Sequence, residues 1–337
     1  MDSLAHEKWF VDAGLYPTDW SFALRPLTLA LLATMVVVTV GWRLAAYRLP
    51  TPELSVLRPL GRLTPYLPRL LAIHLGVSLL TLAVRGNFLS ADLPLGDLPA
   101  PAAVGLVEAA LGVWFITGVA LRPAAIALVA VGPVALAAQG PVSLLEAADL
   151  LGIAGFLAIL PPTTRPYGAT EPEPRRLRHA LLALKTGVAT ALLTLAFSEK
   201  LANPAMARAT LAQHPELDVF ALFGISVPAD TFVAVAGAVE VLFGLLVLSG
   251  ALPQVAVLVA AVPFNATLLI FGSTELVGHL PVYGVFLTLL AYGSDPRTAE
   301  AVRWLPRPRA LPFGTRRLGA GRLGAGVDQA EAAAVPR

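Results

Sequence analysis

The sequence predicts an all-α, polytopic membrane protein with about nine transmembrane helices, and three observations carry this prediction. Hydrophobic residues make up 56% of the 337-residue chain and charged residues only 14%, against roughly 25% charged residues in soluble domains. Apolar runs such as 27–42, 181–197 and 255–272 approach the ~20 residues that cross a bilayer as a helix. The runs are continuous or helical in pattern and lack the in/out alternation of barrel strands, so the spanning elements are expected to be helices.

The candidate spans follow one another along the chain and are separated by short loops that carry most of the charge. Their expected ranges are 26–46, 68–86, 101–120, 123–139, 142–160, 179–197, 230–250, 254–272 and 278–293. With these ranges, 19 of the 24 Lys and Arg residues fall on one side of the membrane. Cytoplasmic loops are rich in Lys and Arg, so we expect a multi-pass protein of the bacterial cell membrane with its N-terminus outside and its C-terminus in the cytoplasm.

An internal repeat organises eight of the nine spans. The stretches LVEAALGVWFITG (106–118) and AVEVLFGLLVLSG (238–250) share the pattern Glu-x3-Gly-x5-Gly at a shift of 132 residues. The same shift pairs Gly140 with Gly272 and Gly152 with Gly284, so a duplicated four-helix unit is expected. Because each unit has an even number of spans, the two copies should be parallel in the membrane, preceded by one extra N-terminal helix.

The repeat divides the chain into five parts. They are an external segment with the first span and a cytoplasmic loop (1–65), a first four-helix repeat (66–161), a Pro-rich cytoplasmic linker (162–178), a second four-helix repeat (179–294) and an Arg/Gly/Ala-rich cytoplasmic tail (295–337). Pro133 and Pro263 are expected to kink the corresponding helix of each repeat.

Glu240 is an embedded carboxylate that recurs in the first repeat as Glu108. A carboxylate inside a bilayer costs several kcal/mol unless it is paired, protonated or turned toward other helices. Two interpretations remain open, namely a hydrogen bond that holds neighbouring helices together and a role in proton or quinone handling.

Two further polar clusters lie on the expected outer side of the second repeat. The stretch FSEKLANP (197–204) carries Glu199 and Lys200, which are expected to leave the membrane there, with Pro204 ending the helix. The stretch GSTELVGHLPVYG (272–284) carries Glu275, His279 and Tyr283, and Pro281 in a first turn would place Glu275 in the preceding loop. Interfacial anchoring is one interpretation. The other is a proton or quinone-headgroup site, with Glu240 roughly 15 Å below it along the helix.

Several kinds of site are excluded or disfavoured. The chain has no cysteine, so disulfides, thiolate catalysis and iron–sulfur ligation are excluded on it. No metal site is expected, because Glu275 and His279 lack a third strong ligand. The excess of Arg lies in loops beside apolar helices, a pattern typical of membrane topology and not of nucleic-acid binding.

The motif Glu-x3-Gly-x5-Gly, followed by RPAA (122–125), together with FSEKL and the second Glu240 element, resembles the DoxX family of bacterial four-helix membrane proteins. The resemblance is best over 178–293 and extends over 68–160, which implies two fused DoxX-like units. Some relatives are subunits of thiosulfate:quinone oxidoreductase, so the resemblance implies a quinone and soluble or membrane redox partners. It also places Lys200 and Glu240 on recurrent polar positions of the family.

The expected function is therefore a quinone-interacting subunit of a membrane oxidoreductase complex. Glu240, Glu199, Lys200 and His279 would handle protons or quinone, with Lys200, Tyr283 and Glu275 near the headgroup. A non-enzymatic membrane scaffold or assembly protein is an alternative from another class, and a small-solute or proton transporter is a third. Whether the chain is itself an enzyme is left open by the sequence.

Overall fold

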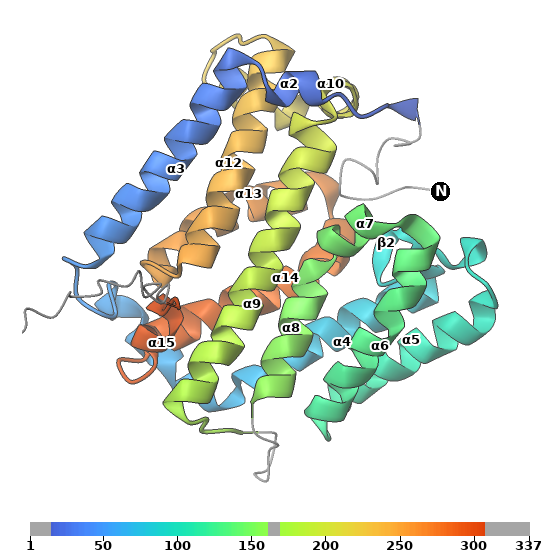
Figure 1. Ribbon diagram of the computed structural model, residues 1–337, viewed down its shortest axis with the longest axis vertical. Coiled ribbons are helices and arrows are strands. Elements are labelled where there is room, and N and C mark those ends of the chain that lie inside the picture. The colour runs from blue at the N-terminus through green and yellow to red at the C-terminus, as the bar shows by residue number, and fades with distance from the viewer. Residues whose placement is uncertain (1–14, 161–168, 307–337) are drawn as a thin grey trace, which may run out of the picture. The chain divides into compact units, whose positions relative to one another are not determined.

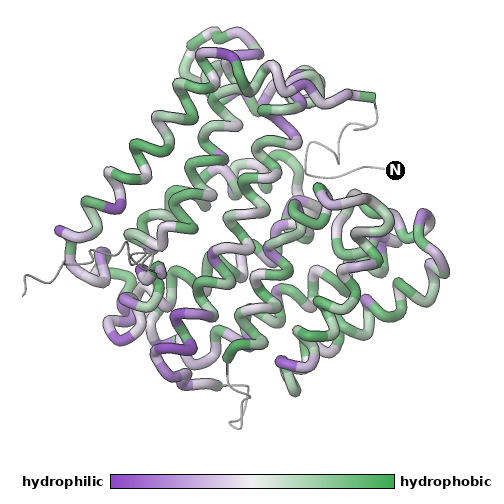
Figure 2. The backbone as a smooth tube through the Cα atoms, viewed as in Figure 1, coloured by the Kyte–Doolittle hydropathy of each residue, from purple (hydrophilic) through white to green (hydrophobic). Residues whose placement is uncertain are grey.

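The computed structural model describes residues 15–160 and 169–306, and most of these residues are helical. Each apolar segment predicted from the sequence contains a helix. The apolar helices are α3 (Pro26–Ala46), α4 (Leu67–Arg85), α5 (Pro101–Thr117), α6 (Leu121–Gln139), α8 (Ala148–Ile159), α9 (Pro174–Leu195), α12 (Ala229–Ser249), α13 (Pro253–Phe271) and α14 (Ser273–Ser294). Figure 2 shows hydrophobic residues along the lengths of these helices and hydrophilic ones gathered mainly near their ends.

Within residues 15–160 and 169–306, six helical segments are long and apolar enough to cross a membrane, by length and composition. They contain α3, α4, α9, α12, α13 and α14. The shorter apolar helices are α5, α8 and the Leu121–Ala135 part of α6. The all-α, multi-pass character is therefore confirmed, while the exact count of nine spans stays a prediction.

Shorter elements connect the apolar helices. They are α2 (Trp20–Ala23), the 3₁₀ helices η2 (Ser55–Tyr66), η3 (Leu95–Asp97) and η6 (Pro215–Leu217), the hairpin strands β1 (Asn87–Phe88) and β2 (Ser90–Pro94), α7 (Pro141–Glu146), the π-helix η5 (Ala196–Leu201), α10 (Pro204–Gln213), α11 (Val219–Leu222) and α15 (Ala299–Arg303). The two strands pair antiparallel, with Asn87 opposite Pro94. The sequence did not predict this hairpin, which extends the loop after α4.

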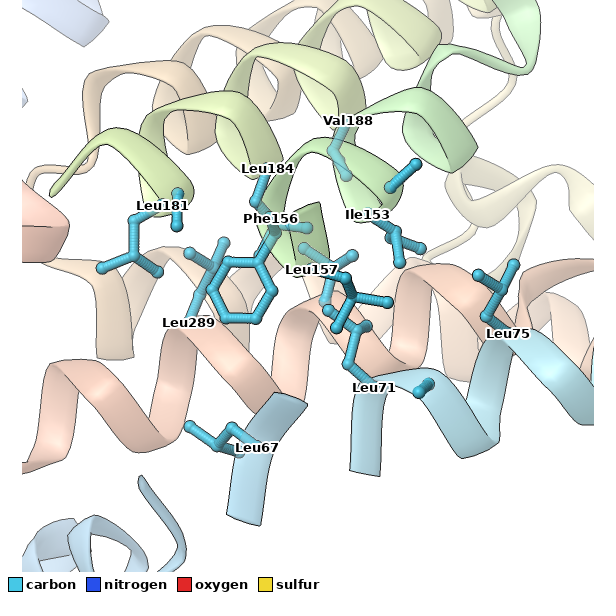
Figure 3. Close-up of a cluster of buried hydrophobic side chains, with 14 of the residues drawn as sticks. Leu67, Leu71, Leu75, Ile153, Phe156, Leu157, Leu181, Leu184, Val188 and Leu289 are labelled. Carbon is cyan, nitrogen blue, oxygen red and sulfur yellow. The ribbon is translucent and has the colours of Figure 1, made fainter. Parts of the chain in front are cut away.

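Four helices, α4, α8, α9 and α14, form the centre of the core. Figure 3 shows their leucines and isoleucine around Phe156 of α8, and all of the labelled side chains are buried. Helix α4 packs on both α5 and α14, and α9 packs on both α8 and α12, so each of these two helices contacts helices from both halves of the chain. Helix α3 lies along α12 at the edge of the bundle (Figure 1).

Glycines allow the closest of these helix contacts. A Cβ atom on Gly187 of α9 would lie 2.5 Å from the Ala148 carbonyl oxygen and 2.5 Å from the Gly152 Cα, both on α8. A Cβ on Gly76 of α4 would lie 2.6 Å from the Gly112 carbonyl oxygen on α5. Because the obstacles are backbone atoms, only glycine lets these helices approach so closely, as is common where membrane helices cross.

Residues 132 positions apart share backbone conformations. Gly118 ends α5 with φ +70° and Gly250 ends α12 with φ +60°, both left-handed. Gly140 precedes α7 with φ +84°, and Gly272 precedes α14 with φ +68°. Glycine adopts such angles without the steric cost that a side chain imposes, which accounts for the glycines in the sequence pattern.

The end of α14 is fixed to η2 by Asp295. Its carboxylate accepts hydrogen bonds from the Arg297 backbone N–H at 2.9 Å, from the Arg297 guanidinium at 2.9 Å and from the Thr64 hydroxyl at 3.4 Å. Burial alone would raise the pKa of Asp295, but the hydrogen bonds from Arg297 outweigh it and hold this pKa below its usual value. The folded state therefore favours the ionised carboxylate.

Candidate functional site

A cavity of about 580 Å³ lies among the helix ends on the side where α12 begins. Its size is in the roughly 300–1,000 Å³ range of small-molecule sites. Most of its wall is apolar and includes Phe88, Phe220, Phe232, Phe243, Phe264 and Phe271. Five of the six residues predicted for the site also line it, namely Glu199, Lys200, Glu240, Glu275 and His279. The cavity thus combines an apolar wall with a few charged groups.

Lys200 connects two of the predicted carboxylates. Its Nζ lies 3.1 Å from a carboxylate oxygen of Glu240 and 3.7 Å from one of Glu199. The Lys200 and Glu240 side chains are 18% and 19% exposed, and Glu199 is 2% exposed. Partial burial strengthens an ion pair relative to one in water, provided that both charges stay matched.

The π-helix Ala196–Leu201 explains how Lys200 reaches Glu240. The chain continues from α9 in a wide turn through this segment, and α10 begins only at Pro204, where the Asn203 side chain caps it. The predicted 15 Å separation between Glu240 and this outer cluster is therefore wrong. The sequence pattern placed Glu199 and Lys200 at the outer end of their span with Pro204 ending the helix, whereas the π-helix ends at Leu201, Pro204 begins α10 and Glu199 is buried.

Glu275 and His279 form a second pair of ionisable side chains that line the cavity. A Glu275 oxygen lies 3.1 Å from His279 Nδ1, and both residues are buried. Within the described part of the chain, the other Glu275 oxygen, Oε2, has no hydrogen-bond partner. One of the residues that line the cavity therefore carries a buried oxygen with the capacity to accept a hydrogen bond.

The predicted loop around Glu275 is wrong, because α14 runs without a break from Ser273 through Pro281. A proline inside a helix leaves the carbonyl four residues earlier without its N–H partner, here that of Val277. The Ser78 hydroxyl of α4 donates to this carbonyl at 3.0 Å. Tertiary contact thus compensates for Pro281 and keeps Glu275 and His279 one turn apart on the same helix.

Tyr283 is the predicted site residue that does not line the cavity. Its hydroxyl donates to the Phe264 carbonyl oxygen at 3.0 Å, and the two rings are in edge contact with centroids 6.4 Å apart. The ring of Phe264 also contacts the His279 ring at 4.9 Å. Tyr283 therefore lies behind Phe264 and supports it, and its contact with a headgroup stays a prediction.

The cavity also receives carboxylates from the first repeat, although the sequence interpretation assigned the site to the second. Glu146, at the end of α7, and Asp149, at the start of α8, both line it. The Ser198 hydroxyl of the π-helix donates to Glu146. The sequence predicted 142–160 as one span, but the helix is interrupted at Ala147 between these two carboxylates.

Glu108, the counterpart of Glu240, has a different environment. It is fully buried and accepts a hydrogen bond from the Leu89 backbone N–H at 2.7 Å. Leu89 lies in the β1–β2 turn with φ +59°, and this residue lines the cavity whereas Glu108 does not. Glu108 therefore holds the hairpin in place, and Glu240 points its carboxylate to Lys200.

Neither a group of metal ligands nor a similar known protein identifies the function of the site. Among residues 15–160 and 169–306, no group of three or more His, Asp or Glu side chains could hold a metal ion. The comparisons found no match to a protein family, a curated protein or a solved structure. The interpretation of the site therefore depends on its own residues.

Proposed function

We propose that this protein is an integral membrane subunit of a quinone-linked oxidoreductase that holds the quinone in the cavity described above. The single observation that carries the proposal is the shared cavity. Charged groups from the π-helix, α12 and α14 meet there within an otherwise apolar wall. A quinone likewise combines a polar part and an apolar part, because its head carries carbonyl oxygens and its tail is a hydrocarbon.

The charged groups suit the chemistry of a quinone head. The Lys200 ammonium can donate a hydrogen bond to a quinone carbonyl, and the imidazole of His279 can donate to the other oxygen. A carboxylate such as Glu240 or Glu275 can accept a proton from a hydroquinone hydroxyl. Embedded ionisable residues commonly mark such proton paths in membrane proteins.

The proposed architecture is a fused pair of DoxX-like four-helix units in the bacterial cell membrane. It is supported by the left-handed glycines 132 residues apart and by the matching positions of Glu108 and Glu240. Both carboxylates interact with the chain just beyond the first helix of their own unit, at Leu89 and Lys200. The Arg-rich side of the bundle would face the cytoplasm.

Extraction and mass spectrometry of the protein purified in mild detergent test the proposal. Wild type should retain about one quinone per chain, and Lys200→Ala and Glu240→Gln should lower this occupancy about tenfold. Glu108→Gln is the matched control, because Glu108 occupies the same repeat position but does not line the cavity. Its occupancy should equal that of wild type.

A non-enzymatic scaffold is the second candidate, because the hydrogen bond from the Leu89 backbone N–H to Glu108 fixes a backbone segment without any ligand. Under this alternative, folded wild-type protein would carry no quinone, and the cavity substitutions would change stability alone. A well-folded, quinone-free wild type would therefore decide for the scaffold.

A further inference from the structure

The wall of the cavity between α12 and α13 differs from its other walls. The short turn Gly250–Leu252 joins these two helices, and we call the parts away from this turn, residues 229–243 and 263–271, their distal halves. Near the turn α13 is packed, with Ala256, Val257 and Ala260 buried. From Pro263 to Phe271, no residue of α13 is buried.

The distal half of α12 has two distinct faces. Ala234, Gly237 and Val241 are buried and do not line the cavity, in line with the packing of α12 on α9, the π-helix and α3. Its other face lines the cavity and is only partly buried, through Phe232, Val235, Ala236 and Val239. On α13 the cavity is lined by Pro263, Phe264, Ala266, Thr267 and Ile270. Small side chains, Ala236 and Ala266, therefore contribute to the two facing walls.

The segment after α10 covers the ends of both distal halves. The His214 ring contacts the Phe271 ring at the end of α13, with centroids 5.0 Å apart. The Phe220 ring contacts the Phe232 ring near the start of α12, with centroids 6.3 Å apart. The ring contacts thus cover this part of the cavity beyond the helix ends, and packed residues close it near the turn. The side between the two distal halves is not covered by either set of contacts.

We propose that the gap between the distal halves is a lateral opening to the bilayer, through which the hydrocarbon tail of a membrane-resident amphiphile leaves the cavity. This inference rests on the proposed function for the position of the head at Lys200, Glu240 and Glu275. Both helices have the length and composition of membrane spans, so acyl chains would surround the gap. Alanine and isoleucine in its walls suit a hydrocarbon chain and offer it no polar partner.

The buried polar end fixes the orientation of the occupant. Glu275 is 3% exposed, and its Oε2 has no partner among the described residues. An unsatisfied buried oxygen favours a ligand head that donates a hydrogen bond, as a hydroquinone hydroxyl does. The head would therefore lie at the charged groups and the tail at the apolar gap, as in other sites that bind amphiphilic molecules.

Filling the gap should separate long-tailed from tailless ligands. Ala266→Phe and Ala236→Phe should lower the affinity for a long-chain benzoquinone about tenfold or more while leaving the affinity for a tailless benzoquinone unchanged. Leu269→Phe is the matched control, since Leu269 is 88% exposed on α13 and does not line the cavity. Binding is measured on the whole protein in lipid nanodiscs, with Lys200→Ala included as the variant that should lose both ligands.

The outcomes distinguish the opening from the function. If Ala266→Phe binds the long-chain quinone as well as Leu269→Phe does, the opening is wrong although the quinone site stands. If wild type binds neither quinone, the proposed function fails.

The reactivity of an introduced cysteine tests the lateral opening independently of quinone binding. The chain has no native cysteine, so only the introduced one can react. Val239→Cys should react with a maleimide dissolved in the bilayer and not with a charged, water-soluble one. The reverse pattern, or no reaction with either reagent, overturns the lateral opening.

Discussion

The ion pair between Lys200 and Glu240 allows a quantitative prediction. At 3.1 Å, two unit charges attract by about 5 kcal/mol at an effective dielectric constant of 20. The side chains are 18% and 19% exposed, so solvent screens part of this attraction. We expect a coupling free energy of about 2 kcal/mol, above the roughly 0.2–1 kcal/mol of exposed pairs and below the roughly 3–5 kcal/mol cost of breaking a fully buried pair.

A double-mutant cycle measures this coupling through the free energy of unfolding. The four proteins are wild type, Lys200→Met, Glu240→Gln and the double variant, unfolded by denaturing detergent at neutral pH. Lys200→Met should cost more than Glu240→Gln, because it leaves two carboxylates facing each other while Glu240→Gln leaves Lys200 with Glu199. A coupling below about 0.5 kcal/mol would refute the reasoning. The exposed pair Arg208–Asp230, at 2.7 Å and about 40% exposure, is the control and should couple by about 1 kcal/mol or less.

Three further predictions concern stability. Gly187→Ala should lower the free energy of unfolding by about 1–3 kcal/mol, since its Cβ would meet backbone, whereas Gly41→Ala, with nothing within 4 Å, should be neutral or stabilising in the same detergent titration. Glu108→Gln should be nearly neutral and Glu108→Leu should cost about 1–3 kcal/mol by thermal unfolding, because only the leucine leaves the half-buried Leu89 N–H without its acceptor and takes away a buried polar partner. The lowered pKa of Asp295 means that its contribution is complete above its unfolded pKa of about 3.9 and is lost as pH falls through its folded pKa. Wild type should therefore lose stability below about pH 4 through this group, Asp295→Asn should lack that part of the loss, and equal pH profiles for the two proteins would contradict it.

The helices were predictable because each depends on its own sequence. A continuous apolar run of about 20 residues has few alternatives to a helix in a bilayer, so α3, α9 and α12 were found within a few residues at most of their ends. The interruption at Ala147 was not predictable, since neither glycine nor proline marks it. The β1–β2 hairpin was also missed, because its anchor at Glu108 comes from another helix.

Most of the ionisable residues that line the cavity could be picked out from the sequence, but their geometry could not. Embedded ionisable residues stand out in an apolar sequence, so Lys200, Glu240 and His279 were identified by composition alone. The distances between their side chains depend on the π-helix, which no local sequence pattern predicts. Likewise, the interpretation of Pro281 as a helix start failed because the compensating hydroxyl of Ser78 lies about 200 residues away in the chain.

The contacts of α4 with α14 and of α8 with α9 join the two halves of the chain, and this has a consequence for biosynthesis. Helix α4 completes its contacts only after α14 has been made, and Gly284 of α14 approaches His74 of α4. At about 5–20 residues per second, the ribosome needs on the order of 10–40 s to translate the intervening chain. During that interval the α14-facing side of α4 is exposed in the bilayer without its partner. A membrane insertase or chaperone that shields inserted helices would therefore act on the first half of this protein until α14 arrives.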